Sequence, residues 1–239
     1  MKASPVFKSA ASRRAVLEAY EGALARRPLP LGASGSGPER LRVATDYGET
    51  AVLAFGPKEA GRPPLLALHG AGTNSSMWLG EAAALARGRR VFAVDIPGEP
   101  GMSEEKPLPW EGEAAAKWLS RVVAGLGLRE HEVLGLSIGG WIALGYAIRN
   151  PEGLRALALL CPSGIGRTRP SFIWKAAFQM ARGRRGLEAI SRSLYGDFPP
   201  PEEAIRIGTV IAESTNPRME KPRLFSDGEL AGIRARATP

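Results

Sequence analysis

Gly135-Leu136-Ser137-Ile138-Gly139 is the stretch that decides the fold of this chain. Glu132–Leu136 is a short, largely apolar run that predicts a buried strand, and Ile138–Arg149 carries apolar residues at helical spacing. A serine between glycines at such a strand-to-helix junction is typical of a nucleophile elbow, a turn so tight that only small residues fit beside the serine. We therefore expect the Ser137 hydroxyl to stand above the sheet, facing the first amides of the helix.

Around this stretch, short apolar runs alternate with segments that carry apolar residues at helical spacing. The expected strands are Leu65–Leu68, Val91–Val94, Val133–Leu136 and Leu154–Leu160, and the expected helices are Ser75–Ala86, Ala114–Leu126 and Ile138–Arg149. A helix at Ser12–Arg26 and two strands joined by a turn, Leu41–Thr45 and Thr50–Phe55, are expected before them. The pattern indicates an α/β fold, a mostly parallel sheet covered by helices on both faces, with an antiparallel start.

The rhythm changes after Pro162, where no strand separates the segments with helical spacing. The helices expected there are Ser171–Ala181, Leu187–Tyr195 and Glu202–Ser214. Ser226-Asp227-Gly228-Glu229 is typical of a capping box that opens a short helix, and Ile233 is expected to lead into a further strand. We therefore divide the chain into a core with an N-terminal helix (1–162), a helical cap (163–225) and the start of a return to the core (226–239).

Composition excludes several classes of function. The 239 residues suit one α/β domain, and no apolar run approaches the roughly 20 residues that span a bilayer. The formal net charge is +8, but the arginines are scattered and no nucleic-acid-binding motif accompanies them, so we expect no nucleic-acid partner. Cys161 is the single cysteine and the N-terminus has no signal-like apolar core, so we expect a cytoplasmic location.

Three motifs lie in order, each after a predicted strand: Leu68-His69-Gly70-Ala71-Gly72, Asp95-Ile96-Pro97-Gly98-Glu99-Pro100-Gly101-Met102-Ser103 and Gly135-Leu136-Ser137-Ile138-Gly139-Gly140. Together they resemble the α/β-hydrolase superfamily, specifically its bacterial lipase/esterase-like members with a helical cap. The resemblance runs from about Leu65 to Leu160, and the second motif departs from the family's pattern by an extra residue in Glu99-Pro100. It implies the α/β-hydrolase fold, with no metal ion and no organic cofactor.

The resemblance also implies the roles of the residues in these motifs. Ser137 would be the nucleophile, and the backbone amides of Ala71 and Ile138 would form the oxyanion hole that stabilises the tetrahedral intermediate of acyl transfer. Trp174 and Phe178 in the cap are candidates for an apolar acyl pocket. The residues that would support the motifs are His69, Gly70, Gly135, Gly139 and Asp95, the last as a loop anchor and not as the triad acid.

A general base for Ser137 is the missing part. In the family the acid and the histidine follow later strands, in the order Ser, Asp/Glu, His, yet the two histidines of this chain, His69 and His131, both precede the serine. His131 lies six residues earlier along the same strand, about 20 Å away, and is expected at the surface. His69 and, less directly, Lys175 remain alternative bases, while Cys161 is expected to be a buried apolar residue.

These features predict a serine hydrolase that acts on a small carboxylic ester or related acyl substrate, impaired in this chain because the triad acid and histidine are missing. The alternatives are a non-catalytic protein that keeps the pocket for a ligand or partner, and a broken product of a hydrolase gene. We expect the carboxyl end to have been lost, so that the last strands of the sheet are absent. The uncovered edge beside Leu154–Leu160 would then invite self-association.

Overall fold

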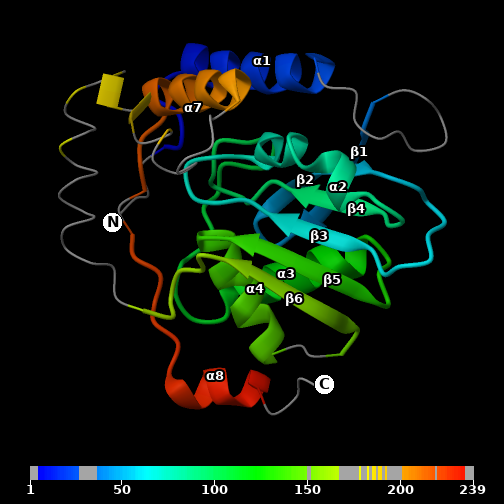
Figure 1. Cartoon of the computed structure of the whole chain (residues 1–239). Coiled ribbons are helices and arrows are strands. Elements are labelled where there is room, and N and C mark those ends of the chain that lie inside the picture. Colours follow the sequence, from blue (N-terminus) through cyan, green and yellow to red (C-terminus); the bar gives the residue numbers. More distant parts are fainter. Residues whose placement is uncertain are drawn as a thin grey trace.

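A six-stranded sheet runs through the middle of the molecule in the order β1-β2-β4-β3-β5-β6 (Figure 1). The computed structural model describes residues 5–26, 37–149, 152–166, 201–218 and 220–234, with single positions between 178 and 192. The strands are β1 (Glu39–Thr45), β2 (Gly48–Phe55), β3 (Leu65–Leu68), β4 (Val91–Val94), β5 (His131–Leu136) and β6 (Leu154–Leu160). β4, β3, β5 and β6 are parallel, whereas β2 is antiparallel to both of its neighbours. The predicted antiparallel start and mostly parallel sheet are confirmed.

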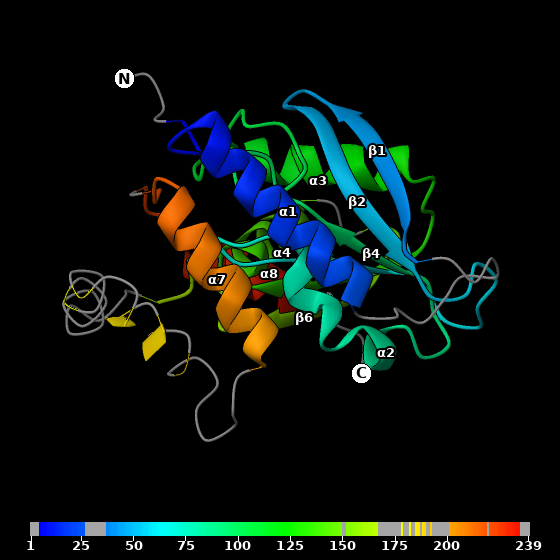
Figure 2. The ribbon, with the colours of Figure 1, turned by 90° about the horizontal axis from the view of Figure 1, so that it is seen from above.

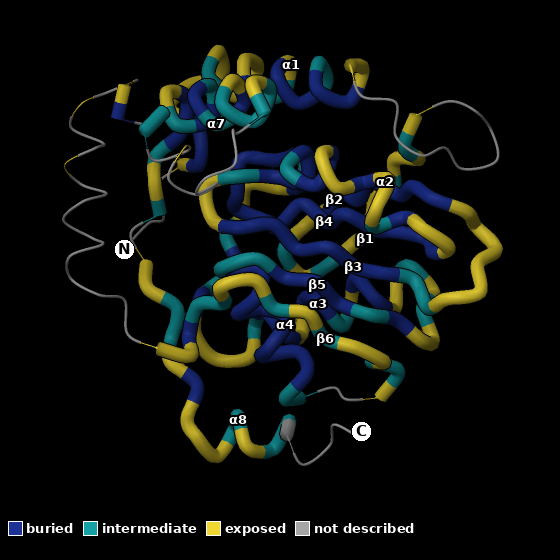
Figure 3. The backbone as a smooth tube through the Cα atoms, viewed as in Figure 1, coloured by how far each residue is buried: buried dark blue, intermediate teal, exposed yellow. Residues whose placement is uncertain are grey.

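Helices cover both faces of this sheet because alternate residues of the central strands point to opposite sides. In β3, Leu65 and Ala67 belong to one buried cluster and Leu66 and Leu68 to the other. Each fully buried leucine side chain contributes about 1.5 to 3 kcal/mol to stability. One face is covered by α1 (Ala10–Arg26), η1 (Ser75–Leu79), α2 (Ala82–Leu85) and α7 (Glu202–Ser214), the other by α3 (Ala114–Gly125) and α4 (Ile138–Arg149). Figure 3 shows the central strands as the most buried part of the chain.

The first and last thirds of the chain meet where α1 and α7 lie side by side (Figure 2). Ile207 and Ile211, one helical turn apart on α7, enter the same buried cluster as residues of α1. Beyond the helices, the amide of Lys8 donates to the carbonyl of Ser214 (3.0 Å) and that of Asn216 to the carbonyl of Val6 (2.9 Å). The segment after α7 is therefore tied to the amino-terminal segment and turns back from there toward the core.

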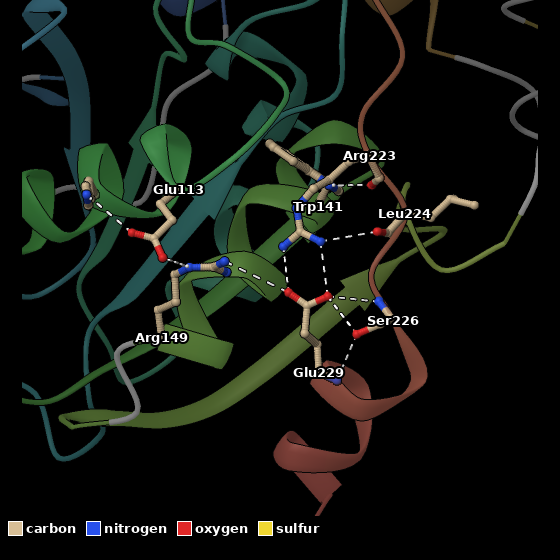
Figure 4. Close-up of polar contacts among 8 residues, drawn as sticks. Glu113, Trp141, Arg149, Arg223, Leu224, Ser226 and Glu229 are labelled. Carbon is tan, nitrogen blue, oxygen red and sulfur yellow. Dashed lines mark hydrogen bonds and ion pairs between the residues drawn. The ribbon is translucent and has the colours of Figure 1, made fainter.

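α8 (Asp227–Arg234) begins with the predicted capping box. The amide of Glu229 donates to Ser226 Oγ (3.3 Å), and the amide of Ser226 donates to Glu229 Oε2 (2.9 Å). The carboxylate of Glu229 also accepts two hydrogen bonds from Arg223, at 2.7 and 3.1 Å (Figure 4). The Arg223 guanidinium and the Ser226 amide lower the pKa of Glu229 to about 2.

The same carboxylate links α8 to the helix that follows Ser137. Arg149, at the end of α4, lies 3.9 Å from Glu229 and donates to Glu113 ahead of α3 (3.0 Å). Trp141 of α4 donates its indole N–H to the carbonyl of Arg223 (3.0 Å), as Figure 4 shows. This network of charges and one indole holds α8 and the chain before it against α4.

Replacement of Glu229 by glutamine, which can still accept the Ser226 amide but loses the charge that Arg223 binds, should therefore lower the free energy of unfolding by about 0.5 to 1 kcal/mol at pH 7. Because folding depresses the pKa of Glu229, its contribution is complete above the unfolded value near 4.5 and disappears as the pH falls toward 2. Urea unfolding of wild type and Glu229→Gln at pH 7 and pH 3.5 measures this loss. Glu59→Gln, at an exposed loop position, is the control; an equal effect of both substitutions would contradict the prediction.

Most predicted elements are confirmed, and Leu65–Leu68, Val91–Val94, Ile138–Arg149, Leu154–Leu160 and Glu202–Ser214 match to the residue. The helix expected over Ser75–Ala86 is instead two short pieces, η1 and α2, separated by a turn at Gly80 and Glu81. Ile233 lies inside α8 and packs against the core, and the strand expected after it falls outside the described residues, so that expectation stays a prediction. The expected helices Ser171–Ala181 and Leu187–Tyr195 fall largely outside the described residues, so the division into core and cap stays a prediction.

β6 lies at one edge of the sheet. Within the described residues it pairs only with β5, and Leu160 at its end is 46% exposed. An unpaired edge of this kind presents backbone amides and carbonyls to other chains. Self-association through this edge stays a prediction.

Candidate active site

Ser137 occupies the turn between β5 and α4 in a left-handed backbone conformation, with φ of 52°. Such a conformation costs a serine about 1 to 3 kcal/mol, so the surroundings must impose it. The amide of Ser137 donates to the carbonyl of Leu160 (3.0 Å), and its own carbonyl accepts from the amides of Trp141 and Ser163 (both 3.0 Å). No described side chain hydrogen-bonds to the half-buried hydroxyl, which leaves it free to react with a ligand.

The predicted crowding around this turn is confirmed at both glycines. A Cβ on Gly135 would lie 2.5 Å from the carbonyl oxygen of Gly139, and one on Gly139 would lie 2.5 Å from the carbonyl oxygens of Leu68 and His69. The start of α4 thus presses directly on the end of β3. A Cβ on Gly70 would lie 3.7 Å from Cβ of Ser137, so the loop after β3 passes close to the serine.

Two backbone amides beside the serine are unengaged. Among the described residues, neither the N–H of Ala71 nor that of Ile138 donates a hydrogen bond. Ile138 is the first residue of α4, where the helix has amides to spare and a partial positive charge. These are the two amides that the sequence predicts as an oxyanion hole, and both remain available to a negatively charged oxygen.

The loop after β4 holds the loop after β3 in place through four hydrogen bonds. The amide of Ile96 donates to His69 Nε2 (2.9 Å) and that of Gly72 to Glu99 Oε2 (2.6 Å). The side chain of Asn74 donates to the carbonyl of Pro100 (2.7 Å), and the amide of Ser75 to Asp95 Oδ1 (2.7 Å). The position of the loop that carries Ala71 therefore depends on the second motif.

His69 uses both ring nitrogens in this arrangement. Nε2 accepts from Ile96, and Nδ1–H donates to the carbonyl of Gly70 (2.8 Å). Full burial lowers the pKa of His69, which keeps the ring neutral. A histidine engaged at both nitrogens cannot also take the proton of Ser137, so the geometry favours a supporting part for His69 over that of a substitute base.

Asp95 joins three separate segments. Its Oδ1 accepts from the amide of Ser75 and from the hydroxyl of Tyr20 on α1 (3.2 Å), and its Oδ2 accepts from the amide of Met102 (2.8 Å). The side chain is buried, and every one of these partners is a structural group. This fits the expected loop anchor.

The structure places Glu99 beside the loop that carries Ala71, although it was not predicted from the sequence as a site residue. Its side chain is only 3% exposed, and burial raises the pKa of Glu99 to about 7. Arg218, from the segment after α7, approaches Glu99 Oε1 to 3.6 Å. The extra residue in the second motif was the available signal, but sequence spacing alone does not show which way the extra side chain points.

Two expectations about other candidates are wrong. His131 is not at the surface but 1% exposed, hydrogen-bonded through Nε2 to the hydroxyl of Tyr146 (2.9 Å), because α4 covers the start of β5. It remains at the strand end opposite Ser137. Cys161 is not buried but exposed, in the turn that follows β6, with φ of 37°.

The cap candidates are placed only in part. Phe178 is 66% exposed, with the Arg182 guanidinium 5.9 Å from the centre of its ring, so the described residues do not enclose it in a pocket. Trp174 and Lys175 lie outside the described residues. Within the described part of the chain, no group of acidic, histidine or cysteine side chains is arranged to hold a metal ion, and no helix is long and apolar enough to cross a membrane.

Residues 63–206 match the alpha/beta hydrolase fold family, and the chain belongs to this family. Among curated relatives it is 30% identical to Carboxylesterase YbfK of Bacillus subtilis over 180 residues, 75% of this chain and 57% of that protein. It is 36% identical to the uncharacterized carboxylesterase nap of the same organism over 121 residues, 51% of this chain and 40% of that protein. The chain thus spans about half the length of these two relatives.

Solved structures show the same similarity. The crystal structure of carboxylesterase CesB (YbfK) from Bacillus subtilis superposes with a TM-score of 0.77 at 28% identity, covering 93% of this chain and 78% of that one. That of naproxen esterase (carboxylesterase NP) from the same organism gives a TM-score of 0.79 at 25% identity, covering 95% of this chain and 79% of that one. The fold predicted from the three motifs is therefore confirmed.

Proposed function

We propose that this chain is a carboxylesterase-like serine hydrolase that acts on a small carboxylic ester or related acyl substrate, with Ser137 as the nucleophile. The observation that carries the proposal is the strained Ser137, held against the loop after β3 with two unengaged amides beside it. Both curated relatives described above are named carboxylesterases, which supports the proposal. The single cysteine of the sequence, Cys161, suits a reducing compartment, so the proposal includes a cytoplasmic location.

The chemistry would follow from this geometry. Ser137 Oγ attacks the ester carbonyl carbon and gives up its proton, and the carbonyl oxygen becomes an oxyanion facing the amides of Ala71 and Ile138. Collapse of this intermediate expels the alcohol, which takes up a proton, and leaves an acyl group on Ser137. Water then releases the acid by the same steps. Each oxyanion donor typically contributes roughly 3 to 4 kcal/mol to the barrier reduction.

Proton transfer from Ser137 is the step for which this chain offers the least support. Its 239 residues include two histidines, one engaged at both nitrogens and the other at the far end of β5. A serine without an adjacent base is a poor nucleophile. The alternative function, a non-catalytic protein that binds a ligand or partner at the same place, draws on this same observation.

We expect the purified chain to hydrolyse p-nitrophenyl acetate slowly, through an acetyl group on Ser137. Serine hydrolases without triad members keep an acceleration of about 10³ to 10⁴ over water, from the oxyanion hole and binding alone. Release of p-nitrophenol measures the rate, and peptide mass spectrometry locates the acetyl group. Ser137→Ala should abolish the acetyl group and the part of the rate that passes through it.

Ser163→Ala is the matched control, because Ser163 lies beside Ser137 but contributes a backbone amide to the turn. It should keep both the rate and the label on Ser137. Binding of the ester without any acetyl group on Ser137 would favour the non-catalytic alternative. Fast turnover that His69→Ala abolishes would contradict the supporting part given to His69.

A further inference from the structure

Glu99 binds the peptide group next to the proposed oxyanion donor. Its Oε2 accepts the N–H of Gly72 at 2.6 Å, a short, charge-assisted distance. This N–H belongs to the peptide that joins Ala71 to Gly72, and Gly72 has a φ of 66°, which favours glycine. A carboxylate that fixes this peptide plane limits the rotation of Ala71, and with it the direction of the Ala71 amide.

Arg218 approaches the same carboxylate from a distant part of the sequence. Its side chain is 15% exposed, and its guanidinium lies 4.2 Å from the centre of the Trp110 ring. It also donates to the carbonyl of Leu108 (2.8 Å) and to Glu220 (2.6 Å). Contacts other than Glu99 therefore hold Arg218, so it presents a fixed positive charge to the loop after β4.

Glu99 and Arg218 form an ion pair that is slightly longer than a hydrogen bond. Glu99 Oε1 and Arg218 Nη1 are 3.6 Å apart, and both are buried atoms without a hydrogen-bond partner among the described residues. The carboxylate thus has one hydrogen bond, to the loop after β3, and one ion-pair partner, on the segment after α7.

We propose that Glu99 is a positioning residue that orients the oxyanion loop through the amide of Gly72, and that Arg218 acts through Glu99 to tie this loop to the segment after α7. The proposal deepens the proposed function and rests on it for its catalytic meaning. It also explains why the second motif carries an extra residue, since Glu99 is part of that insertion.

Protonation of Glu99 would weaken its hold on the Gly72 amide, and burial brings the pKa of Glu99 to about 7, where this happens near neutral pH. The charged groups that face it are Arg218, which favours the carboxylate, and Glu220, which opposes it. Residues 70–76 of the facing loop are all uncharged, and Asp95 of its own loop is occupied by the amides of Ser75 and Met102. The loop would be held most firmly above pH 7.

The test follows the amide resonances of Gly72 and Ala71 in the ¹⁵N-labelled full chain between pH 5 and pH 9. Both should titrate together with a midpoint near pH 7 in the wild type and remain flat in Glu99→Gln. Arg218→Met should raise the midpoint, and Glu220→Gln should lower it. Arg155→Met, which removes an exposed ion pair with Glu130, should leave it unchanged. Resonances that do not titrate, or that titrate equally in Glu99→Gln, would overturn the proposal.

A second arm measures acetylation of Ser137 by p-nitrophenyl acetate at pH 8. Glu99→Ala should slow the step about tenfold with little change in the ester concentration at half-saturation, whereas Glu99→Gln, which keeps an acceptor for Gly72, should restore most of the rate. An unchanged rate in a folded Glu99→Ala chain would overturn the positioning role. If the wild type is not acetylated at all, the proposed function fails, and the titration of Ala71 and Gly72 alone decides whether Glu99 orients the loop.

Discussion

Replacement of Gly139 by alanine is expected to destabilise the chain by about 3 kcal/mol, the upper end of the usual cost of overpacking and a large part of the total stability of an ordinary domain. The added Cβ would lie 2.5 Å from two carbonyl oxygens, those of Leu68 and His69. Both oxygens belong to the backbone at the end of β3, which cannot move away as a flexible side chain would. α4 would have to lift from the sheet, and the turn at Ser137 would move with it.

Gly232→Ala is the control for this substitution. Gly232 lies inside α8, and a Cβ there would meet nothing within 4 Å. Alanine is favoured over glycine inside a helix by roughly 1 kcal/mol, so this variant should be as stable as the wild type or slightly more so. Thermal unfolding followed by circular dichroism compares the two. A melting temperature for Gly139→Ala within a few degrees of the wild type would contradict the close packing of β3 on α4.

The turn around Ser137 and the elements beside it could be predicted from the sequence. Steric rules are local, so Gly135-Leu136-Ser137-Ile138-Gly139 already indicated the turn, the strand before it and the helix after it. The order of the strands followed from the alternation of strands and helices. β3 and α4 are almost wholly buried, and their apolar runs have clear ends in the sequence, so both were predicted to the residue.

The wrong predictions have a common physical cause, because each depends on which other element of the fold packs against the residue. His131 was expected at the surface since it begins a strand, but Tyr146 of α4 covers it. Cys161 was expected to be buried, yet the turn that follows β6 leaves it exposed. No spacing rule connects Arg218 with Glu99, which lie far apart in the sequence and meet only because the chain turns back after α7.

The location of the proposed chemistry also follows from the sheet. β4, β3 and β5 are neighbours and parallel, so the loops that follow them gather at one edge. These loops carry Glu99, Ala71 and Ser137 respectively. Binding sites of open parallel sheets form beyond the carboxyl ends of the strands, since the loops and the first turns of the helices present unpaired amides there. The three sequence motifs are thus one site because the sheet places their strands side by side.

Asp95→Ala should be as damaging as the glycine substitution, at about 3 to 5 kcal/mol, because it leaves buried donors without an acceptor. The amides of Ser75 and Met102 and the hydroxyl of Tyr20 all donate to this carboxylate. Removal of the carboxylate would release the loop after β3 from the loop after β4 and detach α1 at Tyr20. Urea unfolding at pH 7 measures the loss, with Asp46→Ala, at an exposed position in the turn after β1, as a control expected to stay within about 0.5 kcal/mol of the wild type.

Tyr20→Phe measures how much of the stability lost in Asp95→Ala comes from the hydrogen bond between Tyr20 and Asp95. It removes one of the three donors and no packing, so it should cost about 1 kcal/mol, because the Asp95 carboxylate keeps its two backbone amides. Combined with Asp95→Ala, it should add little further loss, since the hydroxyl would already be without its acceptor. Full additivity of the two substitutions would show that Tyr20 and Asp95 act independently, and a loss below about 1 kcal/mol for Asp95→Ala would refute its role as the anchor of the loop that carries Ala71.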